Sequence, residues 1–228
     1  MRSEKTKRAP RLFPPSMAGH CLRYAVMELL GFGRLITPES QAAMRAGSTL
    51  HKTFQQELLQ KESVRAIEAP IRDLDRGISG RIDAVLDDAQ GPLVIEYKTV
   101  SHEKFIRIAN EGPLIQHWAQ LQLYLALGEF KGGRLVVESR ETHGRLTYHS
   151  DGDPAWEAWV LTRVQLAREY QQLRKLPVRE ISAACEQCDR WQRCFASETE
   201  RDHAVQTHPA WDTEPILPDA FRIVAISS

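Results

Sequence analysis

The sequence lacks an excess of charge of either sign. Its 228 residues include 30 Lys and Arg against 30 Asp and Glu, which gives a formal net charge of +0. Because no overall field attracts a polyanion, a nucleic acid must be held by a local basic patch. The hydrophobic fraction of 42% and the charged fraction of 26% are typical of a globular protein. They exclude a wholly disordered, collagen-like or rod-shaped chain.

Long hydrophobic runs are also missing. The most apolar stretch, residues 115–130, is interrupted by Gln116, His117, Gln120 and Gln122. These interruptions argue against a transmembrane helix. The N-terminal residues carry charges but no apolar stretch typical of a secretion signal. We therefore expect a cytoplasmic protein.

Cysteine is scarce, and the four cysteines present are too few for a disulfide scaffold. Cys185, Cys188 and Cys194 are close in sequence, whereas Cys21 stands alone near the start. The Cys-x-x-Cys spacing lets two thiolates bind one metal, and Cys194 can supply a third from a compact loop. A fourth, remote ligand is then needed. Zinc, a redox dithiol and ordinary buried cysteines remain open, although a dithiol leaves Cys194 unexplained.

The length fits one domain, and the order of predicted elements indicates an α/β fold. We expect a basic arm over residues 1–16, a core over 17–180, a cysteine segment over 181–196 and a tail over 197–228. For the arm, a solvated tail and a nucleic-acid contact are both open. Helices are expected over 17–30 with Cys21 inside, 37–61, 114–130 and 153–176. Strands are expected over 64–71, 77–86, 92–100, 134–139 and 146–149, the first three as an antiparallel meander.

Charged side chains on two of these strands form a candidate catalytic group. Side chains alternate across a strand, so Ile82 and Ala84 are expected on one face and Asp83 on the other. Glu96 and Lys98 share a face and lie about 7 Å apart along the strand. If the two strands pair across the turn between them, Asp83 comes alongside Glu96.

Two carboxylates and a lysine on one surface suit metal-assisted hydrolysis. Mg²⁺ and Mn²⁺ prefer carboxylate oxygens, and a metal held by Asp83 and Glu96 can polarise a phosphodiester. The Lys98 ammonium can orient a water or stabilise charge in the transition state. His51, on the preceding helix, can add a ligand. The alternative is that Glu96 and Lys98 form an ordinary exposed ion pair, since short patterns recur by chance.

The sequence at this point resembles the RecB-like branch of the PD-(D/E)XK nuclease superfamily. The motifs are Gly47-Ser-Thr-Leu-His51, Gly80-Arg-Ile-Asp83, Glu96-Tyr97-Lys98 and Gln120-Leu-Gln-Leu-Tyr124, in the order typical of the family. The resemblance implies a restriction-endonuclease-like core, with a mixed central sheet flanked by helices. It also implies that His51, Asp83, Glu96 and the Tyr97 carbonyl bind Mg²⁺ or Mn²⁺ and that Lys98 is catalytic. Gln120 and Tyr124 would support the site and meet the substrate, or else belong to an ordinary half-buried helix face.

One cysteine before such a core and three after it resemble the iron–sulfur clasp of CRISPR-associated RecB-like exonucleases. In that family four thiolates hold a [4Fe-4S] cluster, here Cys21, Cys185, Cys188 and Cys194. The cluster would staple the two ends of the core together. The resemblance implies trimming of single-stranded DNA or overhangs during spacer selection, together with the CRISPR integrase complex. The long tail after Cys194 departs from this family.

Two other functions fit the same residues. One is a subunit of the integration complex that recognises DNA ends or a sequence motif and cleaves little. The other is a repair or phage exonuclease of RecB type outside any CRISPR system. An assay of metal-dependent degradation of single-stranded DNA distinguishes the recognition subunit from an enzyme. The identity of the neighbouring genes distinguishes a CRISPR exonuclease from a repair or phage exonuclease.

Overall fold

The computed structural model describes residues 9–207 and Leu217. Half of the predicted basic arm and most of the predicted C-terminal tail therefore lie outside the described residues. In the described part, none of the helices is sufficiently long and apolar to span a bilayer.

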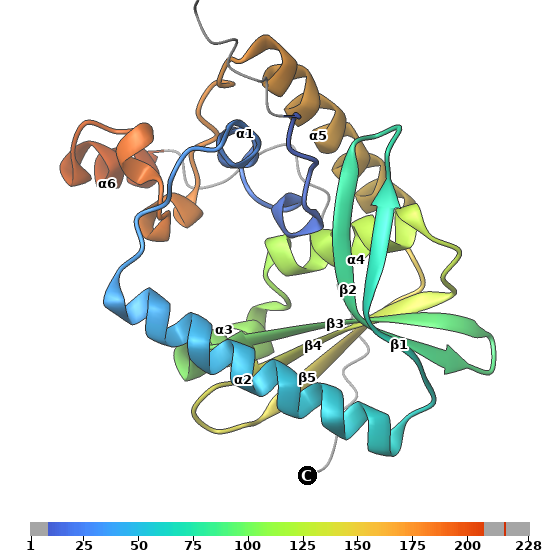
Figure 1. The fold of residues 1–228 in the computed structure, drawn as a ribbon. Coiled ribbons are helices and arrows are strands. Elements are labelled where there is room, and N and C mark those ends of the chain that lie inside the picture. The colour runs from blue at the N-terminus through green and yellow to red at the C-terminus, as the bar shows by residue number, and fades with distance from the viewer. Residues whose placement is uncertain (1–8, 208–216, 218–228) are drawn as a thin grey trace, which may run out of the picture.

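A mixed five-stranded sheet forms the centre of the fold (Figure 1). Its strands follow one another in sequence order, as β1 (Val64–Asp73), β2 (Ile78–Asp88), β3 (Gly91–Val100), β4 (Gly132–Ser139) and β5 (Arg145–Ser150). All neighbours are antiparallel except β3 and β4, which are parallel. The predicted meander and the two later strands are confirmed. The parallel pair follows from the helical crossover between β3 and β4.

Helices cover both faces of the sheet. The helices of the described residues are α1 (Leu22–Leu30), α2 (Pro38–Lys61), α3 (His102–Glu111), α4 (Ile115–Leu127), α5 (Pro154–Leu173) and α6 (Glu198–Thr207), with short 3₁₀ turns at Pro15–Met17, Ala183–Gln187 and Trp191–Arg193. Helix α6 lies away from the sheet, against the turn at Ala183–Gln187. On one face α2 packs Phe54 and Leu58 against Ile95 and Tyr97. On the other face the larger core gathers residues of α1, α4 and α5. Figure 1 shows α2 on the opposite side of the sheet from α4 and α5.

The β1–β2 ribbon bends away from the rest of the sheet (Figure 1). Pairing of β2 with β3 starts at Ala84, so Asp83 lies at this bend. Glu68, which faces this position from β1, has a left-handed backbone with φ 51. The expectation that Ile82 and Ala84 share a face is therefore wrong. Ile82 packs in the larger core, whereas Ala84 packs under α2, because regular alternation does not continue through the bend.

Two helical expectations also need correction. Cys21 does not lie inside a helix, because it is the N-cap of α1 and its Sγ accepts a hydrogen bond from the Tyr24 amide. Helix α3 was not predicted. It begins after Ser101, whose side chain accepts from the Lys104 amide, and it turns Ile108 into the core. The helix is short and amphipathic, with Phe105, Ile106 and Ile108 among its ten residues.

Candidate active site

The site lies where β2 separates from β3. Paired residues of the two strands end at Ala84 and Ile95, so Asp83 and Glu96 come next on each strand. Here a side chain takes the place of the backbone hydrogen bonds between the strands: Asp83 Oδ2 accepts a hydrogen bond from the Tyr97 amide at 2.7 Å. The two strands part, and their carboxylates face one opening. The expectation that Asp83 comes alongside Glu96 agrees with this geometry.

Helix α2 brings His51 to the same opening. The helix starts as predicted, with Thr37 and Ser40 forming a reciprocal capping box and Pro38 in the first turn. Phe54 stacks on the Tyr97 ring at 4.2 Å, which fixes α2 against β3. His51 Nε2 then lies 3.0 Å from the Tyr97 carbonyl oxygen, and its Nδ1 lies 3.7 Å from Asp83 Oδ1.

Glu96 and Lys98 lie on one face of β3, as expected, and form a contact. Lys98 Nζ is 2.6 Å from Glu96 Oε1. The Glu96 side chain is 1% exposed, whereas that of Lys98 is 24% exposed. Within the described residues Glu96 Oε2 is buried and has no hydrogen-bond partner. This ion pair is largely buried. It therefore differs from the exposed ion pair that was the alternative interpretation of Glu96 and Lys98.

Burial sets the protonation of this group. Burial raises the pKa of Asp83, and the Tyr97 amide offsets part of that rise. Burial also raises the pKa of Glu96, and the nearby Asp83 carboxylate adds to the rise. Burial disfavours the Lys98 ammonium, but contact with Glu96 outweighs it and raises the Lys98 pKa. Lys98 is therefore a cation at neutral pH. A second positive charge nearby would stabilise the ionised forms of Asp83 and Glu96.

Sequence reasoning missed Glu68. Ligand atoms of His51, Glu68 and Asp83 all lie within 4.8 Å of one another. Glu68 accepts a hydrogen bond from Gln55 Nε2 of α2 at 2.9 Å and pairs with Arg81 Nε at 3.2 Å. Its place opposite Asp83 follows from the register of β1 and β2. That register could have revealed it, but its left-handed backbone could not be foreseen.

The donor set suits a divalent cation. Ligand atoms of Asp83, Glu68 and His51 lie within 4.8 Å of one another, and the Tyr97 carbonyl oxygen lies 3.0 Å from His51 Nε2. The unpartnered Oε2 of Glu96 adds a buried anionic oxygen nearby. Hard cations such as Mg²⁺ and Mn²⁺ take oxygen ligands of this kind, and Mn²⁺ also takes imidazole. The residues present therefore fit a bound metal.

Gln120 and Tyr124 support β2 from behind. Gln120 Nε2 donates to the Tyr124 hydroxyl at 2.9 Å, and that hydroxyl donates to the Arg81 carbonyl at 2.6 Å. Arg81 lies two residues before Asp83, so the pair holds β2 as it leaves the sheet. Both side chains are buried, with Tyr124 only 1% exposed. This placement favours a supporting role over direct contact with a substrate.

The cysteine segment is anchored on α1. Arg163 donates to both carboxylate oxygens of Glu180, and Glu180 accepts the Leu22 amide at the start of α1. Arg190, almost fully buried, donates to the Tyr24 carbonyl at 3.1 Å and pairs with Glu28 at 2.5 Å. These contacts hold residues 180–190 against the helix that Cys21 caps.

The four predicted cysteines gather in one region. Burial raises the pKa of Cys21 to about 12, and the nearby thiols of Cys188 and Cys185 add to the rise. Cys194 likewise raises the pKa of Cys185, after burial. Among the described residues, no three of the four sulfur atoms lie mutually within 4.8 Å. Tetrahedral zinc would need sulfur atoms about 4 Å apart, since Zn–S bonds are about 2.3 Å.

Comparisons with known proteins agree with this geometry. A model of the PD-(D/E)XK nuclease superfamily matches residues 38–195. No curated protein is similar in sequence. Among solved structures, the protein SSO0001 is 23% identical, with a TM-score of 0.56, over 80% of this chain and 85% of its own.

The alkaline exonuclease LHK-Exo of Laribacter hongkongensis is a second similar structure. It is 16% identical, with a TM-score of 0.54, over 71% of this chain and 88% of its own. Its complex with dAMP has a TM-score of 0.55 at the same identity, over 72% of this chain and 89% of its own. At these identities both likenesses concern the fold, and they confirm the predicted α/β core.

Proposed function

Because the chain belongs to the PD-(D/E)XK nuclease superfamily, we propose that it is a metal-dependent nuclease that shortens DNA strands from their ends. The observation that carries the proposal is the opening between β2 and β3. There Asp83, Glu96 and Lys98 meet, with the Tyr97 backbone held between Asp83 and His51. Glu96 is buried with one carboxylate oxygen unpartnered within the described residues, beside the Asp83 carboxylate, and a buried polar atom in this state points to a bound ion or water.

In this proposal His51, Asp83, Glu96 and the Tyr97 carbonyl hold Mg²⁺ or Mn²⁺, and Glu68 extends the set. The bound metal supplies a Lewis acid for the phosphate and lowers the pKa of water. The chain itself fixes the ligands. The Tyr97 amide orients Asp83, Phe54 fixes the Tyr97 ring, and α2 sets the position of His51.

Lys98 acts as a cation rather than as a base. Its raised pKa keeps it protonated at neutral pH, and Glu96 fixes its Nζ at 2.6 Å. A held ammonium donates hydrogen bonds to an attacking water or to a phosphate oxygen as its charge grows. Since Lys98 is partly exposed and Glu96 is not, Lys98 is the member of the pair that reaches a substrate.

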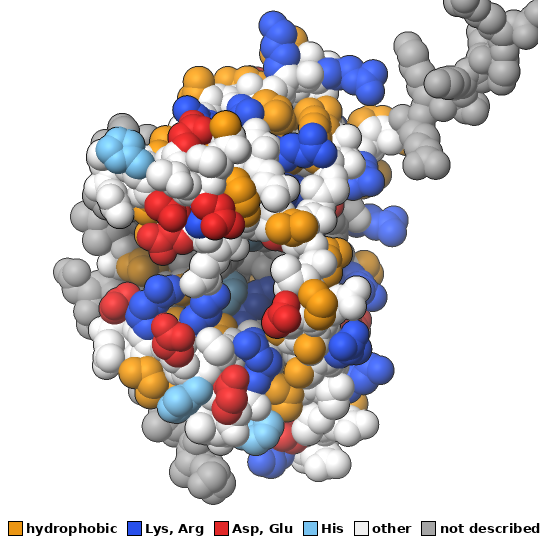
Figure 2. Space-filling view, turned by 90° about the vertical axis from the view of Figure 1, so that its left-hand side faces the viewer, with side chains coloured by type: hydrophobic (Ala, Val, Ile, Leu, Met, Phe, Trp, Pro, Cys, Tyr) orange, Lys and Arg blue, Asp and Glu red, His pale blue; other side chains and the backbone are white. Residues whose placement is uncertain are grey.

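The proposed substrate is single-stranded DNA or an overhang. Two observations support it. Figure 2 shows a hollow on one face of the molecule, with Lys or Arg and His side chains on its floor. The similar structure LHK-Exo is named as an exonuclease and has been solved with dAMP, a product of such digestion. Basic side chains inside this hollow suit a DNA backbone on a chain without net charge.

We further propose that Cys21, Cys185, Cys188 and Cys194 hold a [4Fe-4S] cluster. Their mutual proximity beside α1 and the one-plus-three arrangement of four cysteines along the chain support such a cluster. Such a cluster cross-links the start of α1 to the segment that follows α5. It thereby reinforces the contacts of Arg163 with Glu180 and of Arg190 with Glu28.

The proposed role is trimming of new spacers beside a CRISPR integrase complex. It rests on the resemblance of the motifs and of the cysteine arrangement to CRISPR-associated RecB-like exonucleases. A test is to incubate the anaerobically purified protein with Mn²⁺ and labelled DNA carrying a single-stranded overhang. Stepwise shortening of the overhang, with the duplex left intact, is expected. Unchanged DNA would contradict the nuclease proposal. Shortening without any effect of added integrase would contradict only the CRISPR role.

A further inference from the structure

Basic side chains gather at one edge of the sheet, next to the proposed active site. Strands β3 and β4 are parallel and end side by side, at Val100 and Ser139. Helix α3, with Lys104 in its first turn, begins directly after β3, and Arg140 directly follows β4. Because the carboxyl ends of parallel neighbours meet at one edge of a sheet, Lys104 and Arg140 lie at the same edge. Lys98 lies two residues before the end of β3.

Contacts with β3 and β5 fix this edge. The Arg140 amide donates to the Val100 carbonyl at 2.9 Å, and its guanidinium Nη1 donates to the Thr99 carbonyl at 3.4 Å. Helix α3 is held by the buried Ile108, whose carbonyl accepts from the Tyr148 hydroxyl at 2.8 Å. Both the arginine and the helix therefore have fixed backbones beside the last residues of β3.

The cationic groups of this edge are accessible from the surface. Lys104 and Arg140 are half-buried, and the Arg107 side chain is 53% exposed. Lys104 and Arg107 are three residues apart on α3, so they share one face of the helix. Arg140 has five side-chain N–H groups, and the hydrogen bond to Thr99 uses one of them. Lys104, Arg107 and Arg140 are called the basic edge below.

The basic edge has little negative charge to balance it. Within the described residues, Lys104 and Arg140 form no ion pair with a carboxylate at 4.0 Å or less. Arg107 pairs with Glu111 at 3.9 Å on the surface, a contact that contributes little. Burial lowers the pKa of Lys104, and the charges of Arg107 and Arg140 lower it further, against Glu103. A bound anion would stabilise like charges placed this close together.

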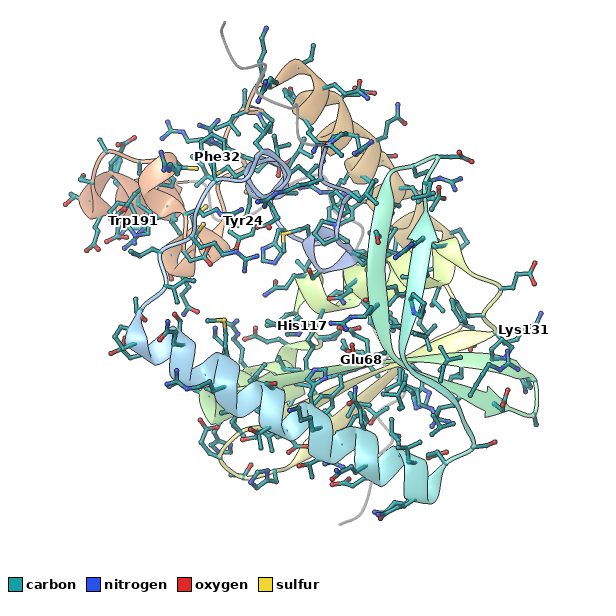
Figure 3. The ribbon with its side chains drawn as sticks, in the orientation of Figure 1. Tyr24, Phe32, Glu68, His117, Lys131 and Trp191 are labelled. Atoms are coloured by element: carbon teal, nitrogen blue, oxygen red, sulfur yellow. The ribbon has the colours of Figure 1, made fainter. Side chains whose placement is uncertain are left out.

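The basic edge continues from the proposed active site. Burial lowers the pKa of His117, and the charges of Lys98 and Lys104 are among those that lower it further, so both lysines lie near this side chain. Figure 3 shows His117 between α4 and α2, on the same side as Glu68. A negatively charged chain that reaches Lys98 can therefore continue over the first turn of α3 to Arg140.

We propose that the basic edge binds the phosphodiester backbone of the DNA strand beyond the phosphate that is cleaved. This inference rests on the proposed function, because Lys98 is taken to face the scissile phosphate. The chain has no net charge, so a local group of cations must supply the attraction for a polyanion. Phosphate contacts position a strand and carry no sequence information, so the basic edge holds strands of any sequence.

The test is the salt dependence of binding of fluorescent single-stranded DNA in EDTA. One phosphate contact contributes about 0.7 to the slope of log affinity against log salt for a single strand. Lys104→Gln and Arg140→Gln should each reduce the wild-type slope by about this amount, for oligothymidylate and for mixed sequences alike.

Lys131→Gln is the matched control and should keep the wild-type slope. It removes the same charge at the opposite end of β3, where the Lys131 amide donates to the Pro92 carbonyl at 2.9 Å (Figure 3). Arg140→Lys is a second control, because it keeps the charge and changes the hydrogen bond to Thr99. It should also keep the wild-type slope.

Unchanged slopes for Lys104→Gln and Arg140→Gln would overturn the proposal, as would an equal reduction for Lys131→Gln or Arg140→Lys. If Arg140→Gln does not fold, as judged by its thermal unfolding, Lys104→Gln alone decides. Binding in EDTA is independent of cleavage. Reduced slopes without nuclease activity in Mn²⁺ would refute the proposed function and leave the basic edge standing. Nuclease activity with unchanged slopes would refute only the basic edge.

Discussion

The Asp83 carboxylate accepts a hydrogen bond from the Tyr97 amide at 2.7 Å, across the point where β2 leaves β3. The Tyr97 backbone is thereby contacted at both of its polar groups, since its carbonyl oxygen lies 3.0 Å from His51 Nε2. The amide fixes a carboxylate, and the carbonyl is itself a donor atom for a metal. The end of a strand ladder thus becomes a rigid frame for cation binding.

Asp83→Asn should stabilise the metal-free protein at high pH and should abolish its stabilisation by Mn²⁺. Burial raises the pKa of Asp83, so without metal the wild type is most stable while this group is protonated. That stability is lost as pH rises from the ordinary pKa of Asp through the raised value. Asparagine keeps an oxygen for the Tyr97 amide and carries no charge. In EDTA the variant should equal the wild type near pH 4 and melt at a higher temperature near pH 8.

Adding Mn²⁺ at pH 8 should then raise the melting temperature of the wild type and not that of Asp83→Asn. Saturation a hundredfold above the dissociation constant corresponds to about 2.7 kcal/mol. Asp75→Asn, on the exposed turn between β1 and β2, is the control. If Mn²⁺ stabilises all three proteins equally, Asp83 is not a ligand.

Arg145 and Glu138 link the strands beneath α2, and breaking this pair should destabilise the fold. Arg145 contacts the carboxylate of Glu138, which is 1% exposed, and pairs with Glu57 of α2 at 2.5 Å. Arg145→Met leaves a buried carboxylate without its main partner, which costs about 3–5 kcal/mol. Urea unfolding should show this loss. Arg145→Met combined with Glu138→Gln should recover much of it, whereas equal losses in both proteins would exclude this cause.

Cys188→Ser should remove the proposed cluster. Serine keeps the size of the side chain but does not hold iron as a thiolate does. The variant is expected to be pale, to contain little iron and to unfold at a lower temperature than the wild type. Glu186→Ala, in the 3₁₀ turn that Cys188 caps, should keep its colour. Anaerobically purified wild type with stoichiometric zinc and no iron would contradict the assignment.

The sequence allowed the pairing of elements to be predicted where local signals were strong. Thr37 and Pro38 mark the start of α2, and the turn after Asp87 and Asp88 sets the β2–β3 register. That register brings Asp83 beside Glu96. Glu96 and Lys98 are two residues apart on one strand, so both must lie on the same face, and their contact could be predicted.

The features that escaped prediction depend on long-range packing. Glu68 adopts a left-handed backbone that a glutamate does not prefer, and the bend there separates Ile82 from Ala84. Neighbours across the sheet determine both effects. The burial of Tyr124 likewise depends on the path of β2, since its hydroxyl reaches the Arg81 carbonyl. A residue pattern along the chain contains none of these contacts.

The most direct test of the account is the rate of single-stranded DNA degradation in Mn²⁺ by wild type and Lys98→Ala, with Lys131→Ala as a surface control. Both variants should fold and keep their iron. We predict metal-dependent shortening by the wild type and the control, and a rate lower by about 10²–10³-fold for Lys98→Ala, as expected when one charge-stabilising donor is lost. Equal rates for all three proteins, or degradation that persists in EDTA, would contradict the assignment of this site.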